Sequence, residues 1–202
     1  MKVALLLEFI DDYSIVSEYD YLIGVDRGAL KAIKNNVKLD LAIGDFDSIT
    51  EDEYEWLKDK VTLKCLNPIK DETDTKEAIA YAYSLSDDVT ILGGIMGRRC
   101  EHFIANLTLF SNYPNLKIVD DNSLIFLKKE SFILEKGPYY YVSFFAKETV
   151  IDLTLKGFKY ELTNYLLKPF DALCISNNIK TLGSVTFAKG ELLVILTKED
   201  SV

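Results

Sequence analysis

Along residues 1–127, short apolar runs alternate with segments whose apolar residues recur at helical spacing. We predict strands at the runs, because strands covered on both faces are short and almost continuously apolar. These strands are Val3–Leu7, Tyr21–Val25, Leu41–Ile43, Val61–Leu66, Val89–Leu92 and Lys117–Val119. Helices are predicted over Asp74–Leu85, where Ala78, Ile79, Ala82 and Leu85 share one face, and over Glu101–Phe110. Strand–helix alternation is typical of a parallel sheet with flanking helices, so residues 1–127 are expected to form a Rossmann-like α/β domain.

The pattern changes after Leu127. Residues 128–202 contain Gly-Pro and other turn signals between aromatic and β-branched runs, without a helical period. This sequence pattern is typical of antiparallel strands, so we predict an all-β, sandwich-like second domain.

Composition and charge limit the classes of partner. Hydrophobic residues make up 49% of the chain, as in globular proteins, and the formal net charge is −9. That charge argues against nucleic acid or an anionic membrane surface as a partner, and no run approaches the ~20 apolar residues of a membrane helix. The start of the chain does not resemble a signal peptide. The three cysteines form neither a disulfide framework nor a zinc pattern, so we expect reduced thiols in a cytoplasmic protein.

Acidic residues recur where the predicted parallel strands end. They are Asp26, Asp45, Asp47, Asp71, Asp74 and Glu101. In an open parallel sheet all these loops emerge at the carboxyl ends of the strands, where such folds bind ligands. Converging carboxylates repel one another unless a cation lies among them, and magnesium takes carboxylate and phosphate oxygens. We therefore predict a metal site, although helix capping is the first interpretation for Thr73 or Asp74 taken alone.

Glycine and arginine lie at the same edge of the predicted sheet. Gly93–Arg99 (GGIMGRR) leads from a strand into a helix, whose N-terminus can receive phosphate, and Arg98 and Arg99 can add forked hydrogen bonds. Asp26–Ala29 (DRGA) repeats the strand–turn–helix arrangement, but neither segment is a Walker A or G-x-G-x-x-G motif. His102 shares a helical face with Asn106, and a structural role for it is favoured over that of a general base.

In this order the segments resemble the thiamin pyrophosphokinase family. GVDRGA, AIGDFDS, KDETDTKEA and GGIMGRRCEHFIAN are similar to the family's D-x-G-A, G-D-x-D-S, K-D-x-T-D and G-G-R-x-D-H-x-x-x-N, and LKGFKYEL and SNN follow late in the chain. The resemblance implies a domain that binds ATP and Mg²⁺, and a β-sandwich domain. It also implies a homodimer with thiamin between domains of different subunits. The implied reaction transfers the terminal pyrophosphoryl group of ATP to the thiamin hydroxyl, giving thiamin diphosphate and AMP.

The resemblance also implies roles for individual residues. The metal ligands would be Asp45, Asp47 and Asp71, and the catalytic set would add Asp74, Arg99 and Glu101. The nucleotide would contact Asp26, Arg27, Gly28, Thr73, Arg99, His102 and Asn106, and thiamin would contact Ser176 and Asn177.

The chain departs from the family pattern at four places. Arg98 replaces a glycine, Glu101 replaces an aspartate, and the loop LEFIDDY after the first strand lacks the glycine often seen there. The proline that usually precedes the G-D-x-D strand is absent from KLDLAIG. We expect Glu101 to be ionised and to act on the metal–phosphate side of the site.

Two other classes of function are compatible with the residues alone. One is a different nucleotide-dependent transferase, such as a glycosyltransferase with a D-x-D metal site, which would use a sugar nucleotide. The other is a non-catalytic sensor of nucleotide or thiamin, which would bind its ligand without turnover.

Overall fold

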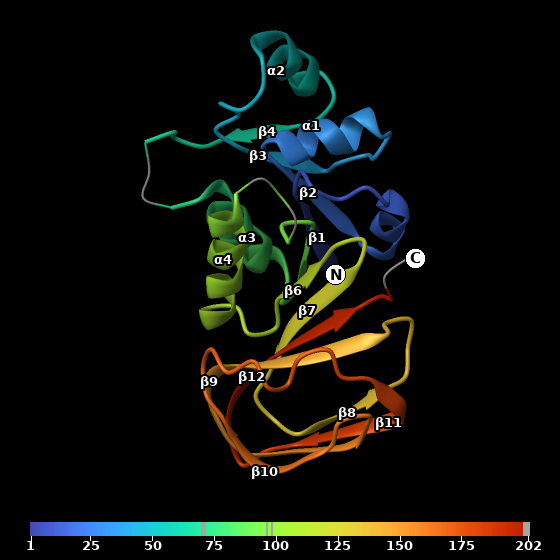
Figure 1. The fold of residues 1–202 in the computed structure, drawn as a ribbon. Coiled ribbons are helices and arrows are strands. Elements are labelled where there is room, and N and C mark those ends of the chain that lie inside the picture. Colours follow the sequence, from blue (N-terminus) through green and yellow to red (C-terminus); the bar gives the residue numbers. More distant parts are fainter. Residues whose placement is uncertain (70–71, 96, 98, 200–202) are drawn as a thin grey trace. The chain divides into compact units, whose positions relative to one another are not determined.

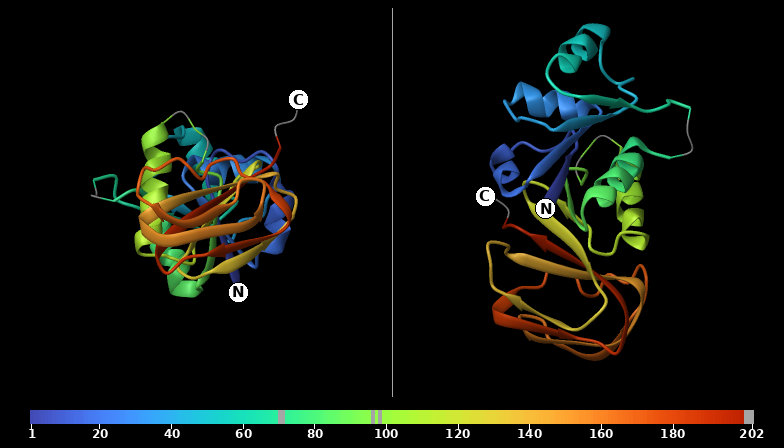
Figure 2. Two further views of the ribbon diagram at one scale, coloured as in Figure 1. Left: turned by 60° about the horizontal axis from the view of Figure 1, so that its bottom comes forward. Right: turned by 180° about the vertical axis from the view of Figure 1, so that it is seen from behind.

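The structure is a computed structural model that describes residues 1–69, 72–95, 97 and 99–199 (Figures 1 and 2). The chain divides into two compact units, Met1–Asp121 and Asn122–Val202. The boundary lies before strand β7 (Ser123–Lys128) rather than after Leu127, because β7 pairs with β12 (Lys189–Thr197) of the second unit. Within the described part of the chain, no helix has the length and apolar character needed to cross a bilayer.

The first unit contains a parallel sheet in the order β4-β3-β2-β1-β5-β6. Its strands are β1 (Lys2–Leu6), β2 (Tyr21–Val25), β3 (Leu41–Gly44), β4 (Leu63–Cys65), β5 (Asp88–Leu92) and β6 (Lys117–Val119). All the strands predicted for residues 1–127 are confirmed. The central strands are buried almost throughout, with Leu5 paired to Ile23 on one side and Ile91 on the other. Burial on both faces explains their continuous apolar runs.

The helices of the first unit are α1 (Arg27–Lys34), α2 (Glu51–Lys58), α3 (Asp74–Leu85) and α4 (Cys100–Thr108), with short 3-10 turns at Tyr13–Glu18 and Leu109–Ser111. The prediction for α3 is confirmed at both ends, although Leu85, predicted on the buried face, is exposed at the last turn. Thr73 caps α3, since its side chain accepts a hydrogen bond from the Lys76 N–H at 3.2 Å. The pattern analysis missed α2, which buries only Leu57 and begins instead with a capping box of Thr50 and Glu53.

The second unit is antiparallel. Its other strands are β8 (Phe132–Glu135), β9 (Tyr141–Phe158), β10 (Leu162–Leu167) and β11 (Ile179–Thr186). The first half of β9 pairs with β12, and the second half pairs with β10 and β11, so the long strand serves two sheets. Val142, Phe144, Phe158 and Leu192 belong to the core of this unit, where the rings of Phe144 and Phe158 meet edge to face.

Candidate active site

A cavity of about 710 Å³ opens in the first unit at the carboxyl ends of the parallel strands. The chain order reverses between β1 and β5, since β2, β3 and β4 lie on one side of this pair and β6 on the other. Crevices at such a switch point are the usual ligand sites of open α/β sheets. The lining includes most of the predicted residues, namely Asp26, Arg27, Gly28, Asp45, Asp47, Asp74, Arg99, His102 and Asn106.

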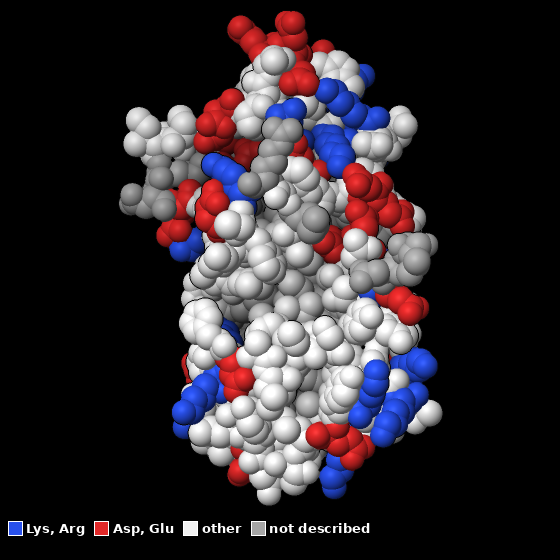
Figure 3. Space-filling model, viewed as in Figure 1, with Lys and Arg blue, Asp and Glu red and all other residues white. Residues whose placement is uncertain are grey.

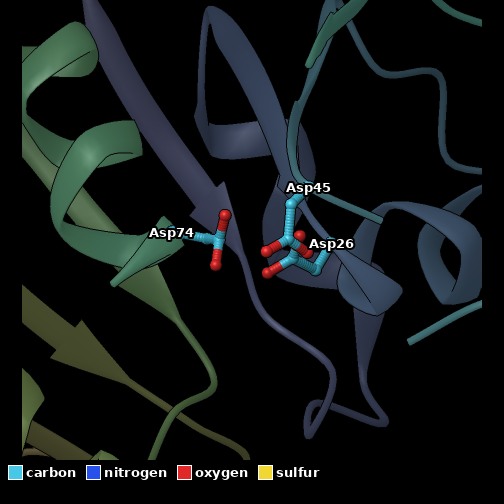
Figure 4. A group of neighbouring side chains, drawn as sticks. All are labelled: Asp26, Asp45 and Asp74. Carbon is cyan, nitrogen blue, oxygen red and sulfur yellow. The ribbon is translucent and has the colours of Figure 1, made fainter. Parts of the chain in front are cut away.

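Three aspartates converge in this cavity (Figure 4). Asp26 follows β2, Asp45 follows β3 and Asp74 begins α3, and each offers one carboxylate oxygen within 4.8 Å of the other two. All three side chains are half-buried, where repulsion between like charges is screened less than in open solvent. Oxygen ligands at this mutual spacing fit a hard divalent cation such as magnesium, which also relieves the repulsion.

Backbone strain accompanies two of these strand ends. Asp26 has φ 47° and ψ −126°, and Phe46 has φ 56°, both unusual for residues other than glycine. The Phe46 side chain is buried and its ring centroid lies 5.8 Å from that of Tyr54 on α2. This strained turn lets Asp45 join the cluster, while Asp47 remains exposed at the cavity and donates its backbone N–H to Asp45 Oδ1 at 3.1 Å. Strain of about 1–3 kcal/mol per residue is retained mainly at functional sites.

Basic groups border the same cavity. Arg99 is the N-cap residue of α4; its Nε lies 3.7 Å from Glu101 Oε1, and its guanidinium lies 3.4 Å from His102 Nδ1. Arg27 begins α1 and pairs with Glu8 at 3.3 Å. Two helix N-termini and two arginines therefore border the cavity that contains the carboxylates, as an anionic ligand bound through a cation would require.

Asn106 supports the loop between β5 and α4. The side chain is buried, and its Nδ2 donates to the Gly94 carbonyl at 3.0 Å. Asn106 therefore holds the glycine-rich turn in place, in addition to lining the cavity.

Several predicted residues lie elsewhere. Glu101 is exposed beside Arg99 and does not belong to the described lining of the cavity, and the Thr73 hydroxyl caps α3. Asp71 and Arg98 lie outside the described residues. The lining also contains residues that sequence reasoning missed, namely Glu8, Phe9, Ser48, Thr75, Ile95 and Phe103. The strand-end rule, applied to the loop after β1, would have found Glu8 and Phe9.

In the second unit, Asn177 and Ser176 have different environments. Asn177 is 3% exposed, and its side chain bonds Tyr160 twice, accepting from the N–H at 3.0 Å and donating to the carbonyl at 2.7 Å. Ser176 is exposed with φ 52°, and its N–H donates to Ser143 Oγ at 2.9 Å. Asn177 therefore fixes the turn that presents Ser176.

The charge of the chain is concentrated in the first unit. Met1–Asp121 contains 13 Lys and Arg against 23 Asp and Glu, whereas Asn122–Val202 contains 10 against 9. On the face drawn in Figure 3, acidic side chains gather over the first unit with basic ones among them, and both signs also occur over the second. A negative unit raises the local concentration of cations around its carboxylate cluster.

Comparison with known proteins identifies similar chains for both units. Residues 13–119 match the family model described as the catalytic domain of thiamin pyrophosphokinase, and residues 131–192 match that of its vitamin B1 binding domain. The chain is 35% identical over 187 residues to a thiamine pyrophosphokinase of Bacillus subtilis (strain 168), covering 88% of this chain and 87% of the relative.

Two solved structures are also similar to this chain over almost its whole length. The crystal structure of thiamine pyrophosphokinase from Bacillus subtilis superposes with a TM-score of 0.87 at 28% identity, covering 98% of this chain and 100% of the other. The crystal structure of a thiamin pyrophosphokinase family protein from Enterococcus faecalis superposes with a TM-score of 0.85 at 29% identity, covering 99% of this chain and 100% of the other. The family resemblance of the sequence motifs is confirmed.

Proposed function

The chain belongs to the thiamin pyrophosphokinase family, and on that premise we propose how its own residues carry out the family's reaction. In this reaction the terminal pyrophosphoryl group of ATP passes to the hydroxyl of thiamin, giving thiamin diphosphate and AMP. The observation that carries the assignment of the site is the convergence of Asp26, Asp45 and Asp74 in the unit that contains the matched catalytic domain.

Magnesium would be held by Asp26, Asp45 and Asp74, with Asp47 as a further carboxylate of the same site. A bound cation supplies charge neutralisation on the phosphate oxygens. Asp71 is assigned to this site by the family resemblance alone. Because displacement at phosphorus depends on positioning and electrostatics, the chain needs no covalent nucleophile. One carboxylate of the site accepts the proton of the thiamin hydroxyl.

ATP would bind in the same cavity, with its phosphates against Arg99, Arg27 and the N-terminus of α1 at Gly28. The contacts of Arg99 with Glu101 and His102 give those two residues a positioning role, because they orient the guanidinium. For Glu101 this replaces the expected direct role at the metal. Thr73 contributes by fixing the start of α3, and thus Asp74.

Thiamin would contact the second unit, which contains the match to the vitamin B1 binding domain. We assign the contact to the exposed Ser176, with Asn177 holding the turn. In this proposal the first unit is the Rossmann-like nucleotide domain and the second a β-sandwich for thiamin.

A homodimer completes the proposal. The segment 166–175 of the second unit exposes Leu166, Phe170, Leu173 and Ile175. This is more apolar surface than a short segment usually leaves to water, and a second copy of the chain would cover it. We place the enzyme in the cytoplasm, on the ground of its cysteine usage.

The reaction itself gives the direct test. Purified protein is incubated with ATP, Mg²⁺ and thiamin, and the products are separated by chromatography. Equimolar AMP and thiamin diphosphate are expected. Formation of ADP and thiamin monophosphate, activity only with a sugar nucleotide as donor, or binding of both substrates without products would overturn the proposal.

A further inference from the structure

Phe9 has an unusual position for a large apolar side chain. It is 39% exposed, yet it lines the cavity that contains the carboxylate cluster. It lies in the loop after β1. The mechanism proposed above uses charged and polar residues of the cavity and leaves this aromatic ring without a role.

The ring is held at the switch point of the sheet. Leu7 donates its N–H to Leu92 O at 2.9 Å, so the loop after β1 starts beside the end of β5. At Phe9 the chain then contacts the loop that leaves β5. A β-carbon built on Gly93 would lie 3.1 Å from the Phe9 carbonyl oxygen, and one on Gly97 would lie 3.2 Å from Cε2 of the Phe9 ring. One part of the ring is thus packed on backbone, and the rest remains open.

The cavity has a charged and an apolar set of lining residues. The aspartate cluster, Arg27 and Arg99 suit a metal-bound polyphosphate, whereas the side chains of Phe9, Leu7, Ile95 and Phe103 have no polar group to bind phosphate. ATP has both characters, with an aromatic base attached to the polyphosphate. Thiamin also has aromatic rings, but the match to the vitamin B1 binding domain lies at residues 131–192, in the other unit.

We infer that Phe9 is the stacking platform for the adenine base of ATP; this inference rests on the proposed function. Every base has a π-face, so stacking on a phenyl ring adds affinity with little selectivity among bases. Because the ring is already packed against Gly97, little side-chain freedom is lost when the base binds. The enzyme therefore tolerates other purine nucleotides, and Phe9 sets affinity for the nucleoside part of the donor.

The test compares ATP with inorganic tripolyphosphate, which has the phosphates without the base. Calorimetry with Mg²⁺ measures binding of both to the unmodified protein, Phe9→Ala and Phe9→Trp. The matched control is Leu85→Ala, a residue equally exposed at 39% in the same unit but outside the described cavity lining. We expect Phe9→Ala to weaken ATP binding about 10-fold and to leave tripolyphosphate unchanged. Phe9→Trp should keep the affinity for ATP, and Leu85→Ala should change the affinity for neither ligand. The affinity of the unmodified protein for GTP should lie within a few-fold of its affinity for ATP.

Three results would overturn the inference. Equal weakening of ATP and tripolyphosphate by Phe9→Ala would give Phe9 a role in the phosphate site or the fold. Unchanged ATP affinity would leave Phe9 without a role in nucleotide binding. A raised KM for thiamin with an unchanged affinity for ATP would assign the ring to the other substrate. If the unmodified protein binds ATP but forms no thiamin diphosphate, the proposed function fails, and the comparison of the two ligands still decides the role of Phe9.

Discussion

Gly44, the last residue of β3, lies directly against the carboxylate of Asp26, so that a β-carbon at position 44 would overlap Asp26 Oδ1. The absence of a side chain at Gly44 therefore makes room for a carboxylate from the neighbouring strand. Asp26 reaches this place through its strained backbone, with φ 47°. A residue with no functional group thus sets the position of the proposed metal ligand Asp26.

Gly44→Ala should therefore impair catalysis through Asp26. A displacement of a ligand by about 1 Å lowers turnover on the order of 100-fold, and we expect a loss of that size in kcat/KM. The control is Gly137→Ala, because a β-carbon at Gly137 would meet nothing within 4 Å. Steady-state assays of both variants, with circular dichroism to check folding, measure the effect. A folded Gly44→Ala variant with normal activity would contradict the role given to Asp26.

Removal of the metal or of a ligand should stop the reaction. A chelator should abolish activity and Mg²⁺ should restore it, and Asp45→Asn or Asp47→Asn should lower turnover by several orders of magnitude.

In Asp45→Asn the unfolding temperature without metal should be unchanged or higher, because one of the clustered like charges is gone. The rise in unfolding temperature that Mg²⁺ gives the unmodified protein should disappear. Asp87→Asn, an exposed residue outside the described cavity lining, is the control. Full activity in Asp45→Asn would refute the assignment.

The strands of the first unit were predictable because burial of both faces gives continuous apolar runs, and α3 because burial of one face gives a helical period. The pattern of apolar residues missed α2, whose stability comes from a capping box and one buried leucine rather than from an apolar stripe. The strand-end rule predicted that acidic residues meet at one edge of the sheet, and Asp26, Asp45 and Asp74 do so because topology alone brings those loops together.

The sequence could not show which carboxylates converge. The strand-end rule listed Asp26 among six acids at that edge of the sheet, and the family resemblance assigned it to the nucleotide. Asp26 meets Asp45 and Asp74 because of a backbone conformation that no residue pattern signals. Glu101 was placed on the metal side by the family motif, whereas its carboxylate lies beside Arg99. Loop conformation and side-chain direction decide such contacts, and both depend on tertiary packing.

The dimer interface is expected on the segment 166–175, because the aromatic run of the same unit, residues 139–145 (YYYVSFF), contributes to the unit's own core. Val142 and Phe144 of that run are buried in the core of their own unit, whereas Phe170 is fully exposed. Phe170→Asp should convert a dimer to a monomer in light scattering at micromolar concentration, because an aspartate would be buried in an apolar contact. Ile69→Asp, exposed at 89% in the first unit, should leave the mass unchanged. A monomeric, fully active unmodified protein would refute the dimer.

Glu191 should make the stability of the second unit depend on pH. Hydrogen bonds from Lys129 and Lys147 lower the pKa of the Glu191 carboxyl from its usual value of 4.5. A carboxyl whose pKa is lower in the folded state stabilises the protein at pH values above its unfolded-state pKa. This contribution is lost as the pH falls through its folded-state pKa. Glu191→Gln should therefore cost up to about 1 kcal/mol at pH 7, and the difference should shrink below pH 4.5. Urea unfolding at several pH values measures it; a difference that does not vary with pH would exclude the ion pairs as its cause.

Ser176 and Asn177 should separate thiamin binding from stability. Ser176→Ala removes an exposed hydroxyl and should raise the KM for thiamin without changing the free energy of unfolding. Asn177→Ala leaves the N–H and carbonyl of Tyr160 without their side-chain partner, so it should cost about 1–3 kcal/mol of stability as well as raise that KM. The KM for ATP should not change in either variant, because both residues lie in the unit that lacks the carboxylate cluster. If Ser176→Ala has a normal KM for thiamin while Asn177→Ala is only less stable, the turn is structural and thiamin binds elsewhere.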